Sequence, residues 1–76
     1  MHKYHSDHDS GVVAYSFKKN SIVVLFHEGW YYLYDDDKPG AQHLKNMIAL
    51  AKKDAGLSTY ISQHVRENYQ RKWRED

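Results

Sequence analysis

The chain has 76 residues, of which 41% are hydrophobic and none is cysteine. A chain this short folds on one core and buries only about 60% of the surface that its unfolded form exposes, so we expect one small domain. The lack of cysteine excludes a disulfide framework, a thiolate nucleophile and a cysteine-based zinc site, and it favours a reducing compartment. Eleven Lys and Arg against ten Asp and Glu leave a formal charge of +1, too small a field to hold nucleic acid nonspecifically.

Residues 1–9 are mostly His, Asp, Ser and Lys and show no apolar period. We predict a flexible arm there, followed by a single domain over residues 10–76. His2, His5 and His8 recur every third residue in the arm, and such a stretch chelates transition metals weakly. A structural or catalytic zinc needs ligands held by a rigid frame, so we predict no metal site.

Three segments carry the pattern of β-strands. Residues 12–17 alternate with period two, and residues 22–26 are apolar on both faces, which is typical of a middle strand in a sheet that is covered on both sides. Gly29 suits the turn that follows, and residues 30–34 form the third strand. The longest apolar run, residues 22–26, is far too short to span a bilayer, so we expect a cytoplasmic protein with no membrane partner.

After residue 35 the apolar period becomes helical. A first stripe and a second stripe, separated by Gly56, predict two amphipathic helices. The first consists of Leu44, Met47, Ile48 and Ala51, and the second of Leu57, Ile61, Val65 and Tyr69. The predicted fold class is therefore α+β, a three-stranded antiparallel β-meander followed by two helices packed on the sheet.

Two further groups invite a metal interpretation. The acidic run of residues 35–37 offers hard oxygen ligands to magnesium, but neighbouring side chains point apart, and the run suits the N-terminus of the helix led by Pro39. We interpret it as a helix cap and dipole partner. The spacing of His27, His43 and His64 brings none of them together, so we place each at the surface or at a boundary.

Four of the five residues 30–34 are aromatic. Trp30, Tyr32 and Tyr34 share one face of the strand, and one interpretation packs them on the helices. The functional interpretation makes exposed aromatics a surface on which bases stack, with phosphates bound by basic residues of the second helix. If Trp30, Tyr32 and Tyr34 are core, Tyr31 on the other face is the better stacking candidate. The basic residues are Arg66, Arg71 and Lys72.

A string of motif residues resembles the KTSC domain over residues 12–71. The motif consists of Phe26, Gly29, Tyr32 and Tyr34, followed by Tyr60, Ile61, Val65, Arg66, Tyr69 and Arg71. That family occurs as a short stand-alone bacterial or phage protein and at the C-terminus of some lysyl-tRNA synthetases. The resemblance implies a shared fold and the RNA binding that has been suggested for the family. The chain departs from the family pattern at Lys38-Pro39, where the family has Val-Pro.

No Gly-rich phosphate loop, serine nucleophile elbow or His-Glu-x-x-His motif occurs, so we predict a non-enzymatic module without a cofactor. One hypothesis is single-stranded RNA binding through Tyr31 and the basic residues. The alternative is a protein-interaction module, such as a phage- or plasmid-type modulator of a host protein complex, which would depend on an aromatic or apolar hot spot. Trp73 either folds back onto the sheet or contacts a partner, and sheet edges or Trp73 offer a route to a homodimer.

Overall fold

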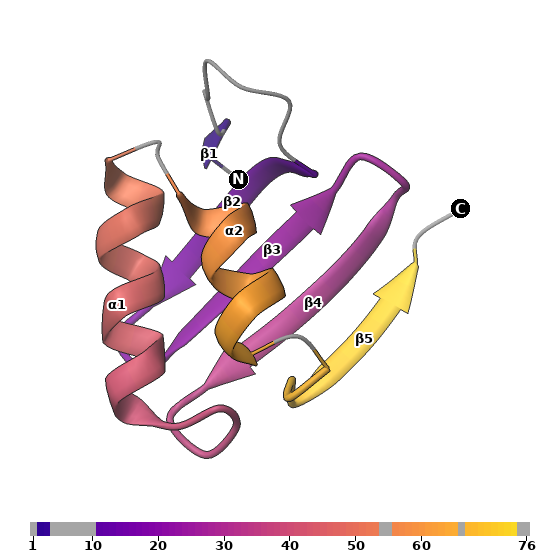
Figure 1. Cartoon of the computed structure of the whole chain (residues 1–76). Helices are drawn as coiled ribbons and strands as arrows, with labels where there is room; N and C mark the ends of the chain where they lie inside the picture. Colours follow the sequence, from indigo (N-terminus) through magenta and orange to yellow (C-terminus); the bar gives the residue numbers. More distant parts are fainter. Residues whose placement is uncertain (1, 4–10, 54–55, 66, 75–76) are drawn as a thin grey trace.

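The computed structural model of the chain describes residues 2–3, 11–53, 56–65 and 67–74 (Figure 1). These residues form one antiparallel sheet of five strands in the order of the chain, with two helices and a π-helical turn. The elements are β1 (His2–Lys3), β2 (Val12–Lys18), β3 (Ser21–Phe26), β4 (Trp30–Asp35), α1 (Ala41–Lys52), α2 (Leu57–Tyr60), the π-helical turn η1 (Ile61–Val65) and β5 (Arg71–Arg74).

The α+β class and the antiparallel meander of β2, β3 and β4 are confirmed, but the number of strands predicted is wrong. The sheet gains a strand at each edge. His2 and Lys3, which we placed in a flexible arm, pair with Tyr15 and Ala14 of β2. The other residues of that arm, including His5 and His8, lie outside the described residues.

The second predicted helix is wrong from its midpoint onward. It ends with η1, and the backbone N–H of Asn68 then donates to the carbonyl of Val65 at 2.6 Å. The N–H of Gln70 donates to the carbonyl of Leu33 at 2.7 Å, and from there β5 pairs with β4. Without a neighbour, the edge of β4 would present unpaired backbone groups and large aromatic side chains. A fifth strand forms hydrogen bonds with these backbone groups and packs side chains against the aromatic rings.

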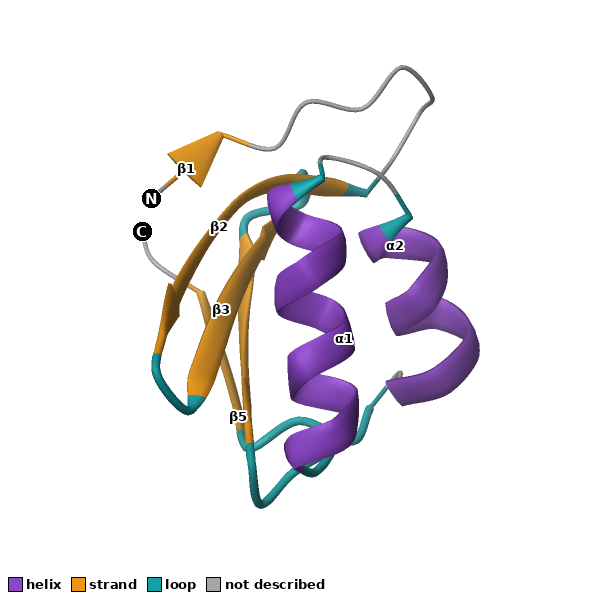
Figure 2. Ribbon diagram, turned by 90° about the vertical axis from the view of Figure 1, so that its left-hand side faces the viewer, coloured by secondary structure: helices purple, strands orange, loops and turns teal. Residues whose placement is uncertain are grey.

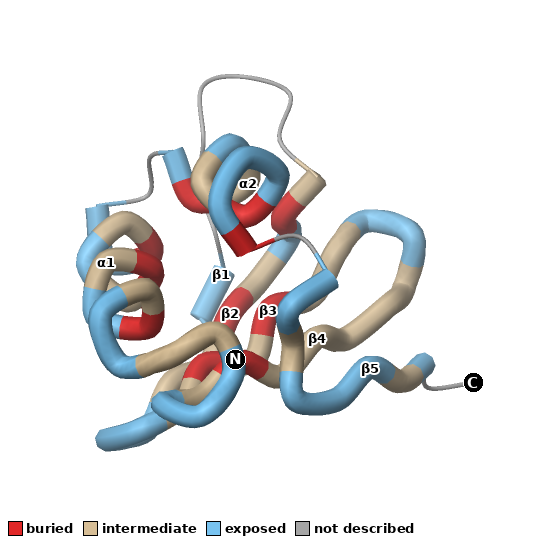
Figure 3. The backbone as a smooth tube through the Cα atoms, turned by 60° about the horizontal axis from the view of Figure 1, so that its bottom comes forward, coloured by how far each residue is buried: buried red, intermediate tan, exposed pale blue. Residues whose placement is uncertain are grey.

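The hydrophobic core lies between the sheet and the helices, as the red stretches in Figure 3 show. The predicted stripes of both helices are buried, except that Ile48 is half-buried and Tyr69 belongs to the loop before β5. A β-bulge between Val12 and Ala14 turns Val12 inward and leaves Val13 39% exposed. The fully buried side chains with the largest volumes are Tyr34, Ile22, Met47, Leu57 and Val24.

The acidic residues 35–37 do not cap α1, contrary to the prediction. The residue before the helix is Gly40, at φ 115°, and no side chain caps the first turn. Asp35 instead organises the turn after β4, because its Oδ1 accepts hydrogen bonds from the N–H groups of Asp37 and Lys38, each at 2.9 Å. The Lys38 hydrogen bond is the main reason that the pKa of the Asp35 carboxyl lies below its usual value. The side-chain amide of Gln70 also donates to Asp35, which ties this turn to the start of β5.

Both helices lie on the same side of the sheet, as Figure 2 shows. No helix or strand of the described residues covers the other side. The prediction that β3 is covered on both faces is therefore wrong, and its side chains Val23 and Leu25 are half-buried rather than buried. Within the described part of the chain, no helix has the length and apolar character needed to cross a membrane.

We expect Met47→Ala to lower the free energy of unfolding by about 2 to 5 kcal/mol, because the side chain is fully buried and its loss leaves a cavity. That is a large share of the stability of a domain of this size. Val13→Thr, at the exposed bulge, is the control and should change stability by less than about 0.5 kcal/mol. Urea denaturation followed by circular dichroism measures both, and similar losses for the two variants would contradict the packing described.

Candidate functional site

Two rows of cross-strand neighbours cross the middle of the uncovered side of the sheet, and a polar row of Lys18, Ser21 and Asp35 lies beside them. Residues that pair across an antiparallel sheet point to the same face, so the strand register defines each row. We call these two rows the open face. One row consists of Lys3, Ala14, Leu25, Tyr31 and Trp73, and the other of Ser16, Val23, Leu33 and Arg71. Lys3 and Arg71 are exposed and the other seven are half-buried, so the open face has an apolar, accessible centre with a cation in each row.

Tyr31 and Trp73 form the most distinctive pair on the open face. They lie directly opposite each other on β4 and β5, with ring centroids 5.4 Å apart and an angle of 8° between the ring planes. The guanidinium carbon of Arg71 lies 5.6 Å from the Trp73 ring centroid. Trp73 therefore folds back onto the sheet, one of the two alternatives that the sequence left open. The stacked rings of Tyr31 and Trp73 and the guanidinium of Arg71 therefore lie side by side.

Lys72 lies on the opposite side of the sheet from Arg71. Its ammonium nitrogen is 4.5 Å from the centroid of the Trp30 ring and 5.4 Å from that of Tyr32. The prediction of one basic helix surface is therefore wrong, because β5 is a strand and sends alternate side chains to opposite faces. The structure brings Tyr31, Arg71 and Trp73 together and separates Lys72 from them. Arg66 lies outside the described residues.

The aromatic motif residues Phe26, Tyr32 and Tyr34 lie on the helix side of the sheet. Tyr34 is fully buried, and Tyr32 packs between Phe26 and Tyr69 with ring centroids at 4.9 Å and 5.2 Å. Gly29 has φ 93° in the turn between β3 and β4, a conformation that favours glycine. The interpretation of Trp30, Tyr32 and Tyr34 as core-facing is confirmed for Tyr32 and Tyr34, whereas Trp30 is half-buried and does not pack against the core.

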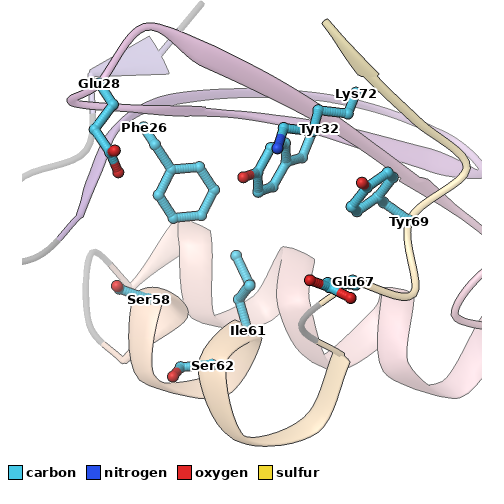
Figure 4. Close-up of a pocket in the computed structure, with 9 residues that line it drawn as sticks. All are labelled: Phe26, Glu28, Tyr32, Ser58, Ile61, Ser62, Glu67, Tyr69 and Lys72. Carbon is cyan, nitrogen blue, oxygen red and sulfur yellow. The ribbon is translucent and has the colours of Figure 1, made fainter.

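The rings of Phe26, Tyr32 and Tyr69 form an aromatic wall on the helix side of the sheet. A groove of about 350 Å³ opens between this wall and the second helical segment, which consists of α2 and η1 (Figure 4). The sequence did not predict it, because it needs both β5 and the end of the helix at Val65. Phe26 and Tyr32, two motif residues, were the available signal. Its lining residues are Phe26, Glu28, Tyr32, Ser58, Ile61, Ser62, Glu67, Tyr69 and Lys72.

The rings of His43, Tyr60 and His64 form a cluster, so the prediction that no two of the histidines come together is wrong for His43 and His64. The hydroxyl of Tyr60 shares a hydrogen bond of 2.6 Å with His43 Nδ1 and accepts one from Asn46 Nδ2 at 3.1 Å. The His64 ring is 4.5 Å from the Tyr60 ring and 6.2 Å from that of His43. This cluster joins α1 to the second helical segment. Among the described residues, no three His, Asp or Glu side chains lie close enough together to hold a metal ion.

No family model, curated protein or solved structure matches the chain. The described residues define a small α+β domain whose antiparallel sheet has helices on one face only. What it does must be inferred from the open face and the groove.

We expect stability to fall as pH rises above about 10, and Tyr34 to cause part of this fall. Burial, followed by the neighbouring Tyr32 and Tyr69, raises the pKa of Tyr34 well above its ordinary value. Above pH 10 the unfolded chain releases this proton while the folded chain keeps it. The free energy of unfolding therefore falls by up to about 1.4 kcal/mol per pH unit.

The test is the melting temperature of the parent and Tyr34→Phe between pH 8 and pH 11.5. The variant loses the titrating group and should decline less steeply over this range, whatever its stability at pH 8. An equally steep decline in the two proteins would show that Tyr34 does not contribute.

Proposed function

We propose that the chain is a small non-enzymatic module that binds single-stranded RNA on the open face. The observation that carries the proposal is the parallel pair of Tyr31 and Trp73 on a sheet surface without a covering helix, with Arg71 beside it. Sheet modules that bind single-stranded RNA expose aromatic rings on which bases stack. Such stacking tolerates any base, because every base has a π-face.

The geometry favours weak binding. Tyr31 and Trp73 cover one side of each other, so a base would stack on an outer side of the pair. The guanidinium of Arg71 lies next to that pair and would contact a phosphate or stack on a base. The chain has a formal charge of only +1, which limits the electrostatic contribution that normally dominates affinity for nucleic acid.

The resemblance to the KTSC domain supports the proposal from a different direction. RNA binding has been suggested for that family, and one of its forms is attached to an enzyme that handles transfer RNA. The motif residues Phe26, Tyr32 and Tyr34 pack on the helix side of β4. In this proposal they hold β4 in place, while Tyr31 on the other side of the same strand meets a cytoplasmic RNA.

A protein partner is the second candidate function. The observation that favours it is the aliphatic centre of the open face, where Val23, Leu25 and Leu33 are half-buried neighbours of the aromatic pair. An aromatic anchor surrounded by apolar side chains is typical of a hot spot in a protein interface. A second copy of the chain or a host protein complex would then cover the face.

We expect Tyr31→Ala and Trp73→Ala each to weaken binding of a short single-stranded oligonucleotide by roughly 1 to 3 kcal/mol, the usual contribution of one stacked base. Fluorescence titration with labelled RNA at low salt measures it. Val13→Thr, outside the open face, should leave affinity unchanged. Circular dichroism of each variant confirms that β5 remains folded. If the folded parent does not bind RNA at low salt, the protein-partner candidate takes its place.

Arg71 and Lys72 form a matched pair for the electrostatic part of the proposal, because they are adjacent basic residues on opposite faces. Arg71→Ala should reduce the slope of log affinity against log salt by about 0.7, the contribution of one phosphate contact on a single strand. Lys72→Ala should leave the slope nearly unchanged. Equal changes in the two variants would place the RNA elsewhere than on the open face.

A further inference from the structure

The groove on the helix side is a second surface with its own chemistry. Its sheet wall is aromatic, because Phe26, Tyr32 and Tyr69 lie ring to ring, and Ile61 faces them from η1 (Figure 4). Its volume of about 350 Å³ is within the range of sites for small molecules. The open face lies on the other side of the sheet, so a ligand in the groove would not meet RNA bound there.

Two carboxylates flank the aromatic wall. Glu28 comes from the turn between β3 and β4 and Glu67 from the segment after η1, and Figure 4 shows them on either side of the Phe26 ring and the Ile61 side chain. Both residues are exposed. Among the described residues, neither carboxylate has a hydrogen bond or ion pair. Two negative charges beside an apolar wall repel phosphate and carboxylate groups and attract a cation.

The chain already holds one cation against this wall. The ammonium of Lys72 lies over the rings of Trp30 and Tyr32, at 4.5 Å and 5.4 Å from their centroids. Aromatic faces attract cations through their quadrupole, and alkyl chains pack on the same faces. Lys72 is also the one basic residue among the described residues that line the groove.

We propose that the groove binds a linear aliphatic diamine. Its two ammonium groups would pair with Glu28 and Glu67, and its methylene chain would lie on the rings of Phe26 and Tyr32. A diamine satisfies the three features together, namely two separated negative charges, an apolar wall between them and a small volume. A single ammonium or a neutral chain of the same length satisfies fewer of them.

The experiment is a titration of the full chain with 1,5-diaminopentane at low ionic strength, followed by NMR of the aromatic resonances of Tyr32 and Tyr69. We expect saturable shifts, and weaker binding of pentylamine. Glu28→Gln and Glu67→Gln should each weaken binding of the diamine by about two- to fivefold, the range of an exposed ion pair. Asp36→Asn removes an exposed negative charge outside the groove and should change affinity by less than about twofold.

Lys72→Met should tighten binding of the diamine, because it removes the competing cation from the groove. Phe26→Leu removes one ring of the aromatic wall and should weaken binding of the diamine. Absence of saturable shifts in the parent would overturn the proposal. So would equal losses in Asp36→Asn and Glu28→Gln, since these would indicate only general attraction of cations to the chain. Arg71→Ala should leave diamine binding unchanged, so this proposal and the RNA proposal fail separately.

Discussion

The pairing of β5 with β4 is the interaction on which both candidate sites depend. It sets Trp73 against Tyr31 on one side of the sheet and Lys72 over Trp30 on the other. The loop that leads into β5 carries Tyr69, which completes the aromatic wall of the groove. Backbone hydrogen bonds and aromatic cross-strand contacts act together here, and each such side-chain pair contributes roughly 0.2 to 1 kcal/mol. Without this strand the open face would lose Trp73 and Arg71, and the groove would lose one wall.

The sequence predicted the parts of the fold that depend on local periodicity. Strands β2 to β4 and helix α1 have clear periods of two and 3.6, so their positions and most of their buried residues follow directly. Residues 66–74 contain neither glycine nor proline, and Tyr69 continues the helical stripe of Val65, so nothing local predicts a strand. The formation of β5 depends on pairing with the edge of β4, which is distant in the sequence. The bulge that exposes Val13 is equally invisible in a simple alternation.

The same contrast explains how much of the candidate site could be predicted. The sequence indicates Tyr31 as a stacking candidate and leaves two alternatives open for Trp73, but their contact requires β5. A helical pattern places Arg71 and Lys72 on one broad surface, because neighbours on a helix turn can share it, whereas neighbours on a strand point to opposite faces. The two sides of the sheet therefore differ in chemistry. The open face offers aromatic rings with a guanidinium, and the groove offers aromatic rings with carboxylates.

The alternation of side chains in β5 makes the register of this short strand decide which side chains each side of the sheet presents. A slip of one residue against β4 would exchange Arg71 and Trp73 with Lys72 and Arg74 between the two sides of the sheet. The side above the groove would then gain a tryptophan, and the open face would receive two flexible cations without their aromatic partner. The contacts of Gln70, to the carbonyl of Leu33 and to the carboxylate of Asp35, hold the chain at the start of the strand against such a slip. Gln70 thus stabilises the register that places Trp73 on the open face and Lys72 above the groove.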